Sequence, residues 1–391
     1  MVLFSTKNVQ LDEENKKALH NYQYKGGDNG ISYKYFHSPV AEFFVKFVPG
    51  WVAPNVITFA GALCLVIPHI VSLVLYGPAF EGETEQWAAL TVGIMHMAYI
   101  TLDNMDGKHA RNTKNSSPLG QMFDHGCDAI TFSLAVFTLA RYRQIGSGYL
   151  TFVFAILAPT GYFMYNIKEF YMGEYYLPII NPVSEGSLLE FFFSAYCASF
   201  HWEEWSKPII FGLNRGQAYA AFFVIFQIYQ NIEMMFEIIN AKKYERKFEN
   251  KKFYIQFSSY FLLVALCIVA TFVSPNDIIH HPIEGGRSII YIIIFGSSYL
   301  VLHLMFGHLA NKEFYPYSTP PFVISIFSIV GGIVASIFCP EIFGTYEFYF
   351  WYIIAAYLLI NSLTCFCSII VSMENCFGIK AFKVKPKEKT Q

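Results

Sequence analysis

The sequence predicts an all-α polytopic membrane protein with about ten transmembrane helices and a short interfacial helix before them. Of its 391 residues, 54% are hydrophobic and only 14% are charged, whereas soluble proteins carry about a quarter charged residues. Apolar runs long enough to cross a hydrocarbon core of roughly 30 Å recur along the chain. Basic residues gather in alternate connections between these runs, which is typical of a membrane topology.

Residues 1–50 form the first predicted region, a cytosolic N-terminus that ends in the interfacial helix. The stretch 1–36 is polar and contains no apolar segment typical of a cleavable signal peptide. Ser38 is expected to cap a helix that has Pro39 at its first position. Apolar residues then recur at helical spacing between Val40 and Phe47. Because Pro49 stops this helix before it can span, we expect it at the membrane interface, with packing on the protein's own surface as the alternative.

Residues 51–375 form the predicted transmembrane region, and residues 376–391 form a cytosolic basic tail. The ten apolar runs lie at about 55–76, 87–105, 124–143, 148–168, 187–204, 216–239, 253–273, 288–309, 321–339 and 347–372. The fifth run is the weakest, since Glu190 interrupts it. The eight cysteines show no Cys-x-x-Cys spacing and are interpreted as small buried hydrophobes. The net charge of −2 and the absence of a basic domain indicate no nucleic-acid partner.

Charge placement orients these runs. The Lys-bearing N-terminus, the connection Lys108–Lys114, the connection Lys242–Lys252 and the five lysines from Lys380 onward share one side if ten runs span. The opposite connections are acidic or neutral, so the basic side is expected to be cytosolic. Arg141 and Arg143 break this pattern and are interpreted only as the end of a helix on the lumenal side.

A cluster of aspartates lies where the second run ends and the third begins. With small residues on the same helical faces, the positions are Asp103, Asp106, Gly107 and Ala110, followed by Gly120, Asp124 and Asp128. Unpaired carboxylates near a bilayer repel one another and resist desolvation, so they predict a bound cation. Hard oxygen ligands favour Mg²⁺ or Mn²⁺. The glycines and the alanine leave room for a nucleotide, and Arg111 offers a planar fork of donors to a phosphate.

The spacing Asp103-x2-Asp106-Gly107-x2-Ala110-Arg111-x8-Gly120-x3-Asp124-x3-Asp128 resembles the signature of the CDP-alcohol phosphatidyltransferase family. A single Asp-x-x-Asp would be better explained as an acidic loop in water, but eight positions at fixed spacing are a strong signal. The contexts Asp-Gly-Lys-x-Ala-Arg, Ser-Pro-Leu-Gly and Phe-Asp-His-Gly-Cys-Asp resemble the eukaryotic choline/ethanolamine phosphotransferase branch. Gln121 departs from the glutamate expected in many relatives.

The resemblance implies that phosphoethanolamine or phosphocholine passes from CDP-ethanolamine or CDP-choline to diacylglycerol, with release of CMP. Two Mg²⁺ or Mn²⁺ ions would then be held by Asp103, Asp106, Asp124 and Asp128. His125 lies within this cluster and is the expected general base, with Asp128 as the alternative.

Two further residues are expected in the substrate site. Asn55 lies in a Pro-Asn-x-Ile-Thr stretch similar to the family's first membrane helix, so the resemblance makes it a cytidine contact. The resemblance makes Glu185 a potential partner for the head-group ammonium, although the sequence alone favours a residue that simply begins the next helix.

The resemblance also implies a homodimer in the endoplasmic reticulum or Golgi membrane, with the site facing the cytosol and membrane lipid as a partner. Lys387 and Lys389 fit a dilysine retrieval signal, a pattern that a basic solvated tail also produces. The sequence does not distinguish choline from ethanolamine.

Alternative functions make different sequence demands. Another acceptor alcohol, such as inositol, would remain within the family. An intramembrane prenyltransferase requires a second Asp-rich motif, whereas Asp277 is the only aspartate after Asp128. A divalent-cation-coupled transporter would show related halves with interrupted helices, and none is evident.

Overall fold

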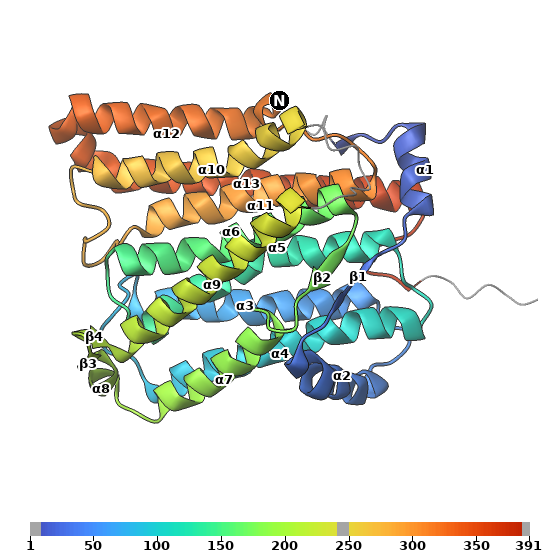
Figure 1. Ribbon diagram of the computed structural model, residues 1–391, viewed down its shortest axis with the longest axis horizontal. Helices are drawn as coiled ribbons and strands as arrows, with labels where there is room; N and C mark the ends of the chain where they lie inside the picture. The colour runs from blue at the N-terminus through green and yellow to red at the C-terminus, as the bar shows by residue number, and fades with distance from the viewer. Residues whose placement is uncertain (1–8, 241–249, 385–391) are drawn as a thin grey trace, which may run out of the picture.

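The protein is a bundle of long helices, described here from a computed structural model that covers residues 9–240 and 250–384 (Figure 1). Its long helices are α3 (Pro54–Tyr76), α4 (Gln86–Asn112), α5 (Pro118–Tyr142), α6 (Tyr149–Met172), α7 (Ser184–Ala198), α9 (Arg215–Asn240), α10 (Asn250–Phe272), α11 (Arg287–Leu309), α12 (Pro320–Phe338) and α13 (Pro340–Phe377). Each coincides with one of the predicted apolar runs, so the all-α polytopic prediction is confirmed.

Seven of these helices are long and apolar enough to cross a membrane by length and composition, namely α3, α6 and α9–α13. The other three differ for reasons that lie in their sequences. Helices α4 and α5 carry the aspartates of the motif, and α7 has 15 residues, with Glu190 in its middle. At 1.5 Å per residue, α7 is roughly 22 Å long, which is shorter than the hydrocarbon core.

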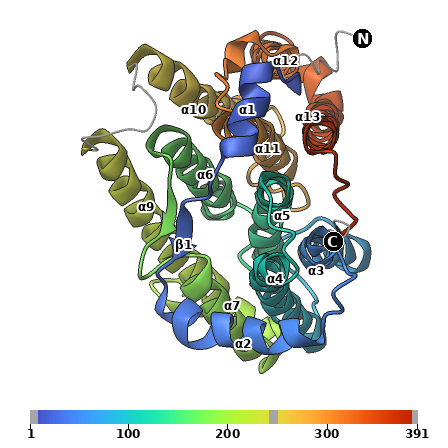
Figure 2. The ribbon, with the colours of Figure 1, turned by 90° about the vertical axis from the view of Figure 1, so that its right-hand side faces the viewer.

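Helix α11 forms the centre of one half of the bundle. Its apolar window is entirely buried, as expected for a helix that is hydrophobic on all sides. It packs against α5, α6, α10 and α13, and Figure 2 shows these helices around it when the bundle is viewed from its end. Helices α3, α4, α5 and α7 form the other half, which carries the motif.

The N-terminal segment lies across the end of the bundle where α4 ends and α5 begins (Figure 2). It consists of α1 (Glu13–Asn21), β1 (Gly26–Asp28), a π-helical stretch (Tyr33–His37), α2 (Ser38–Phe44) and a 3₁₀ turn (Val45–Phe47). Strand β1 pairs in parallel with β2 (Tyr175–Leu177), which follows α6. Position 26 must be glycine because a Cβ there would lie 2.5 Å from the Tyr175 carbonyl oxygen.

The predicted cap at Ser38 is wrong. Its backbone is helical, with φ −65° and ψ −47°, because the preceding π-helical stretch runs directly into α2. The Ser38 hydroxyl instead accepts a hydrogen bond of 2.8 Å from Lys108 Nζ on α4. Phe43, Phe44 and Phe47 are about half or more exposed, and this exposed apolar face is what an interfacial helix requires.

The motif region is more helical than the apolar runs indicate. Helix α4 continues through Asn112 and α5 begins at Pro118, so only residues 113–117 connect them. Ser117 caps α5, its Oγ accepting a 3.2 Å hydrogen bond from the backbone N–H of Gly120. The predicted basic connection from Lys108 onward is therefore mostly the last turn of α4. Most of the second basic connection, residues 242–249, and the Lys387 and Lys389 pattern lie outside the described residues.

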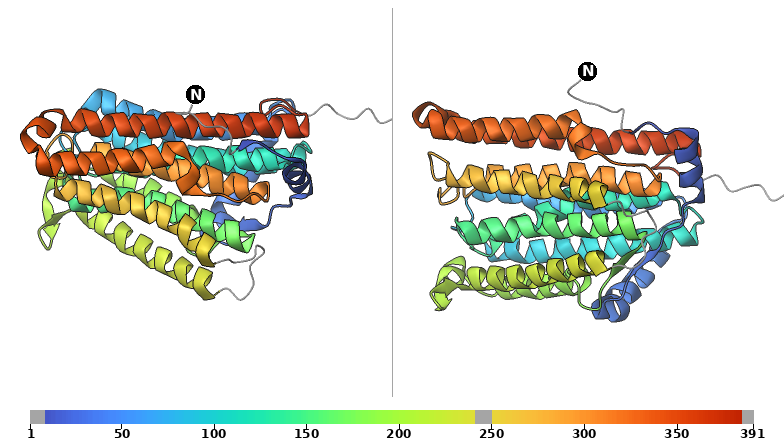
Figure 3. Two further views of the ribbon diagram at one scale, coloured as in Figure 1. Left: turned by 90° about the horizontal axis from the view of Figure 1, so that it is seen from above. Right: turned by 45° about the horizontal axis from the view of Figure 1, so that its top comes forward.

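The opposite end of the bundle holds α8 (Trp202–Ser206) and a small hairpin of β3 (Pro208–Ile210) and β4 (Leu213–Asn214). The views of Figure 3 separate this end from the one that carries the N-terminal segment. Arg141, at the end of α5, donates to the carbonyl oxygens of Glu81 and Glu83, the latter at 2.7 Å. One of the two unexplained arginines therefore fixes the connection between α3 and α4.

Candidate functional site

The four aspartates of the motif lie where α4 and α5 approach each other. One carboxylate oxygen from each of Asp103, Asp124 and Asp128 lies within 4.8 Å of the others. Opposite ligands of an octahedral Mg²⁺ ion are about 4.2 Å apart, so a small contraction of this group would form part of such a site. The structure thus brings together three of the four predicted metal ligands.

Asp106 is held separately from these three. Its Oδ2 accepts a hydrogen bond from the hydroxyl of Thr58 on α3, and its side chain is buried. Thr58 follows Asn55 by three residues, so the first turns of α3 present both side chains toward the site. Thr58 was not among the predicted site residues, and this spacing is the signal that could have identified it.

The donor set fits a cation because its charges are not balanced by protein groups. In the part of the chain that the structure describes, no lysine or arginine forms an ion pair with any of the four aspartates. Asp124 Oδ1 is buried and has no hydrogen-bond partner there. Asp128 Oδ1 accepts a 2.8 Å hydrogen bond from the Tyr99 hydroxyl. Buried and half-buried carboxylates at this density require a counter-ion to remain charged.

His125 lies beside this cluster, as predicted. Its Nε2 is 4.0 Å from Asp124 Oδ2, and its Nδ1 is buried without a hydrogen-bond partner among the described residues. The imidazole packs against the ring of Tyr175, with centroids 5.2 Å apart, and contacts Tyr24 edge-on. The Tyr162 hydroxyl donates to its backbone carbonyl at 2.7 Å. The ring is therefore positioned by aromatic contacts and keeps its nitrogens for other partners.

A first cavity of about 430 Å³ opens on one side of the cluster. Among its lining residues are Asn55, Asp106, Gly107, Ala110, Arg111, Gly120, Asp124 and His125. Five of the six predicted substrate-binding residues therefore share one cavity. A Cβ added at Gly107 or Gly120 would approach other atoms no closer than 3.5 and 3.7 Å, respectively. Since no protein group fills these positions, the glycines keep space free for a ligand.

A second cavity of about 320 Å³ lies on the other side of the cluster, between α4, α5, α6 and α9. Its lining includes Asp103, Asp128, Tyr99, Tyr162 and Tyr175. The two cavities share Tyr24, Asp106, Gly107, Arg111, Asp124 and His125. The acidic cluster and His125 thus stand where two separate compartments meet.

Glu185, the sixth predicted substrate contact, is placed elsewhere. Its carboxylate accepts hydrogen bonds from the backbone N–H and hydroxyl of Ser32 at 2.8 and 3.0 Å, and from Asn181 N at 3.1 Å. It is not among the residues that line either cavity. As a residue of the first turn of α7, it is directed toward the N-terminal segment and anchors that segment.

Gln121 also acquires a physical explanation. Its amide Nε2 is 3.1 Å from the Tyr22 hydroxyl and 3.4 Å from Glu169 Oε1 on α6. A glutamate at position 121 would place a second carboxylate against the buried Glu169. The amide avoids that repulsion and donates instead.

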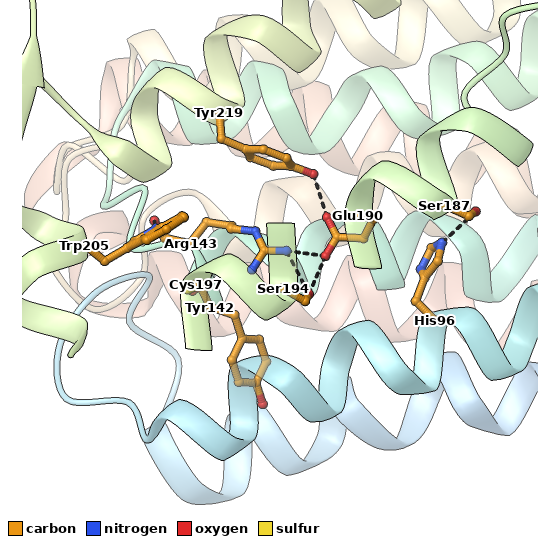
Figure 4. A network of polar contacts seen from close by, with 9 residues as sticks. All are labelled: His96, Tyr142, Arg143, Ser187, Glu190, Ser194, Cys197, Trp205 and Tyr219. Carbon is orange, nitrogen blue, oxygen red and sulfur yellow. Dashed lines mark hydrogen bonds and ion pairs between the residues drawn. The ribbon is translucent and has the colours of Figure 1, made fainter. Parts of the chain in front are cut away.

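A second buried polar network lies at the other end of α5 (Figure 4). Arg143 is fully buried, and its Nη2 donates to Glu190 on α7 and, at 2.9 Å, to Ser194 Oγ. The Tyr219 hydroxyl on α9 donates to the second oxygen of Glu190 at 2.8 Å. A Cβ at Gly216 would lie 1.5 Å from the Arg143 carbonyl oxygen, so glycine lets α9 approach α5 here. Arg143, which broke the charge pattern, and Glu190, which interrupts the fifth apolar run, are therefore partners of each other.

Comparison with known proteins is consistent with the geometry. The family model for CDP-alcohol phosphatidyltransferase matches residues 51–180, which include α3 to α6 and all four aspartates. Choline/ethanolaminephosphotransferase 1 of Arabidopsis thaliana is 33% identical over 48% of this chain and 48% of its own length.

Two other relatives match over longer regions. Ethanolaminephosphotransferase 1 of Mus musculus is 28% identical over 70% of this chain and 71% of its own length. An uncharacterized CDP-alcohol phosphatidyltransferase class-I family protein of Dictyostelium discoideum is 27% identical over 82% of this chain and 76% of its own. The match to the Arabidopsis protein spans about half of that relative. Residues 51–180 of this chain therefore form a domain that matches the CDP-alcohol phosphatidyltransferase family model.

Proposed function

We propose that this protein transfers phosphoethanolamine or phosphocholine from a CDP-aminoalcohol to diacylglycerol and releases CMP. The observation that carries the proposal is the meeting of two cavities at one acidic cluster with a histidine beside it. A transferase that moves a group from a polar nucleotide donor to an apolar alcohol needs a separate compartment for each substrate. The names of the Arabidopsis and mouse relatives supply the substrate class.

The nucleotide is assigned to the first cavity. There Arg111 presents its guanidinium to the diphosphate, and Asn55 and the glycine positions line the space for cytidine and ribose. Asp103, Asp106, Asp124 and Asp128 would hold Mg²⁺ or Mn²⁺, with two ions expected. When bound, these ions would neutralise the diphosphate and the charge that develops on the departing CMP.

His125 is proposed to accept the proton of the acceptor hydroxyl as that oxygen bonds to the β-phosphorus and the bond to CMP breaks. The Nε2 atom is suited to this because Asp124 Oδ2, 4.0 Å away, would stabilise the imidazolium that forms. Tyr175 and Tyr24 restrict the rotation of the ring, so it remains directed toward the cluster. Asp128 is the less suitable base because the Tyr99 hydroxyl already donates to it.

The lipid alcohol is assigned to the second cavity. Gln230 on α9 lines this cavity and also a larger neighbouring one of about 980 Å³. The larger cavity lies between α9, through Phe226 and Tyr229, and the N-terminal residues Asp28 to Ser38. Since exposed apolar side chains of α9 face outward beside it, diacylglycerol would approach from the bilayer along this side of the bundle.

The location and assembly follow from the same proposal. The basic segments that the structure describes gather at the end of the bundle that carries the site, so that end is proposed to face the cytosol. We also propose that the protein forms a homodimer in the endoplasmic reticulum or Golgi membrane. Labelling of a single cysteine introduced at Thr113 in sealed vesicles tests the orientation, because a lumenal Thr113 would contradict it.

The experiment that tests the activity is a product assay on the purified protein in detergent. With diacylglycerol, Mg²⁺ and either CDP-ethanolamine or CDP-choline, we expect CMP and the corresponding phospholipid to appear in equal amounts. No product should form without diacylglycerol. Release of CMP that does not depend on a lipid acceptor would refute a phosphotransferase and leave a hydrolase.

A further inference from the structure

The first cavity has one wall that does not belong to the family domain. Ile379, Lys380, Ala381 and Lys383 line it together with the ends of α3, α4 and α5. These residues follow α13 and lie about two hundred positions beyond residue 180, where the matched domain ends. From its sequence alone, this stretch is expected only to begin a basic cytosolic tail.

The wall is held in place by specific contacts. Gly378 ends α13 in the left-handed conformation, with φ +64°, and turns the chain back. Glu374 then accepts hydrogen bonds from the Ala381 backbone N–H at 2.7 Å and from Lys380 Nζ at 2.8 Å. Ala381 itself is buried. The chain direction at the cavity is therefore fixed by contacts within the chain.

An aromatic contact attaches the same stretch to the nucleotide side of the bundle. The ring of Phe382 lies 5.2 Å from that of Phe123 on α5 and 6.3 Å from that of Phe59 on α3. Phe59 follows Thr58, and Phe123 precedes Asp124, so the contact is made beside two residues of the site. Loss of the Phe382 ring would release the wall from both helices.

The two lysines of the wall differ in what they contact. Lys380 is paired with Glu374, whereas Lys383 Nζ has no partner among the described residues and its side chain is exposed at the cavity. Lys383 and Arg111 therefore bring positive charge to a cavity that also contains Asp106 and Asp124. A phosphate-bearing ligand in this cavity would meet the metal ions held by the carboxylates on one side. Lys383 and Arg111 would then complement its negative charge from the other side.

We infer that residues Ile379–Lys383 complete the nucleotide site, with the ammonium of Lys383 contacting the phosphate-bearing part of CDP-alcohol and CMP. This inference rests on the proposed function, because it takes the first cavity to be the nucleotide cavity. It adds a substrate-binding residue outside the aspartate motif of α4 and α5 and explains why the chain returns to the site after α13.

The test is equilibrium binding of CMP to the purified full-length protein in the presence of Mg²⁺, measured by calorimetry. Lys383→Gln should raise the dissociation constant about threefold to fivefold, the size of a partly exposed charge contact, and Lys383→Arg should restore it. The loss should fade at high salt, since a charge at an open cavity is screened. Phe382→Ala should weaken binding by about tenfold, because it frees the whole wall.

Lys17→Gln is the matched control. Lys17 is an exposed lysine of α1 that lines neither cavity, so its removal should leave CMP affinity unchanged. Thermal unfolding without ligand checks that each variant is folded, and Lys383→Arg keeps the test valid if Phe382→Ala is unstable. Wild-type affinity in Lys383→Gln and in a chain ended after Phe377 would overturn this inference alone. Failure of the wild type to bind CMP would overturn the proposed function as well.

Discussion

The two ends of helix α5 carry ionisable side chains with opposite surroundings. At its beginning, Asp124 and Asp128 join Asp103 in a group of carboxylates that forms no ion pair with a lysine or arginine of the described residues. At its end, Arg143 meets Glu190, Ser194 and the Tyr219 hydroxyl. The two sites are separated by 15 residues between Asp128 and Arg143, which is roughly 22 Å along the helix.

This difference distinguishes charged side chains that stabilise the fold from those that serve to bind a ligand. The Arg143 network contains its own counter-charge, because Glu190 pairs with Nη2 of Arg143, so the fold itself balances the charge there. The aspartate cluster is unsatisfied by the fold, and a cation with an anionic substrate would complete it. Both are intramembrane ionisable groups, and only the balance of partners distinguishes them. Four predictions test this distinction, beginning with the largest expected effect.

Neutralising the cluster should abolish activity without unfolding the protein. Asp124→Asn or Asp128→Asn is expected to lower the rate of transfer by at least about 10³-fold, comparable with the loss of a main electrostatic contributor. The unfolding temperature of the ligand-free protein should stay the same or rise, because mutual repulsion of the carboxylates decreases. Transfer assays and thermal melts on the same preparations measure both. Near-normal activity in both variants would contradict the metal assignment.

The opposite pattern is expected at the other end. Arg143→Met leaves Glu190 buried without its cation and should destabilise the protein by roughly 3–5 kcal/mol. The double variant Arg143→Met with Glu190→Leu should recover most of that loss, since a buried pair replaced by apolar groups is often neutral. CMP affinity of the folded fraction should be retained. A double variant as unstable as the single one would mean that the network does not act as a pair.

The two ends of α5 differ in how much of each could be predicted from the sequence. Asp103, Asp106, Asp124 and Asp128 were predictable because helical periodicity and the intolerance of membranes for charge both act locally in sequence. Arg143 and Glu190 each appeared as an isolated exception, because their pairing depends on how α5 and α7 pack. The contacts of Glu185 with Ser32 and Asn181 are tertiary as well, so the sequence could not reveal them.

Other features had no sequence signal that local reasoning could use. The apolar runs end before the helices of the motif do, because α4 and α5 continue there as polar helix. Ser38 does not cap because a π-helical turn precedes it. Lys383 reaches the site only through the turn at Gly378 and the contact of Phe382 with α3 and α5.

A smaller effect is expected at His125, which lies beside the aspartate cluster but is not one of its carboxylates. His125→Ala should lower the transfer rate by roughly 10²-fold, the usual contribution of a general base. CMP affinity should change little, because the four aspartates and Arg111 remain. Turnover measured beside CMP binding separates the two roles. If affinity falls in proportion to rate, His125 is a binding residue and the base lies elsewhere.

The smallest effect concerns the identity of the cation. Mn²⁺ should support transfer at a rate within about tenfold of Mg²⁺, because both accept octahedral oxygen ligands, and Ca²⁺ should support it poorly because it prefers longer bonds and more ligands. Titration of each ion into the metal-free enzyme measures this. Equal rates with the three ions would indicate that the cluster does not impose a geometry.

The most direct test of the account is the binding of Mn²⁺, followed by electron paramagnetic resonance, to the wild type and to one variant from each end of α5. With CMP present, we predict that the wild type binds Mn²⁺ tightly, that Asp124→Asn loses this binding, and that the folded Glu190→Gln protein keeps it. Mn²⁺ affinity that is unchanged by Asp124→Asn, or abolished by Glu190→Gln, would contradict the assignment of the unpaired carboxylates as the metal site.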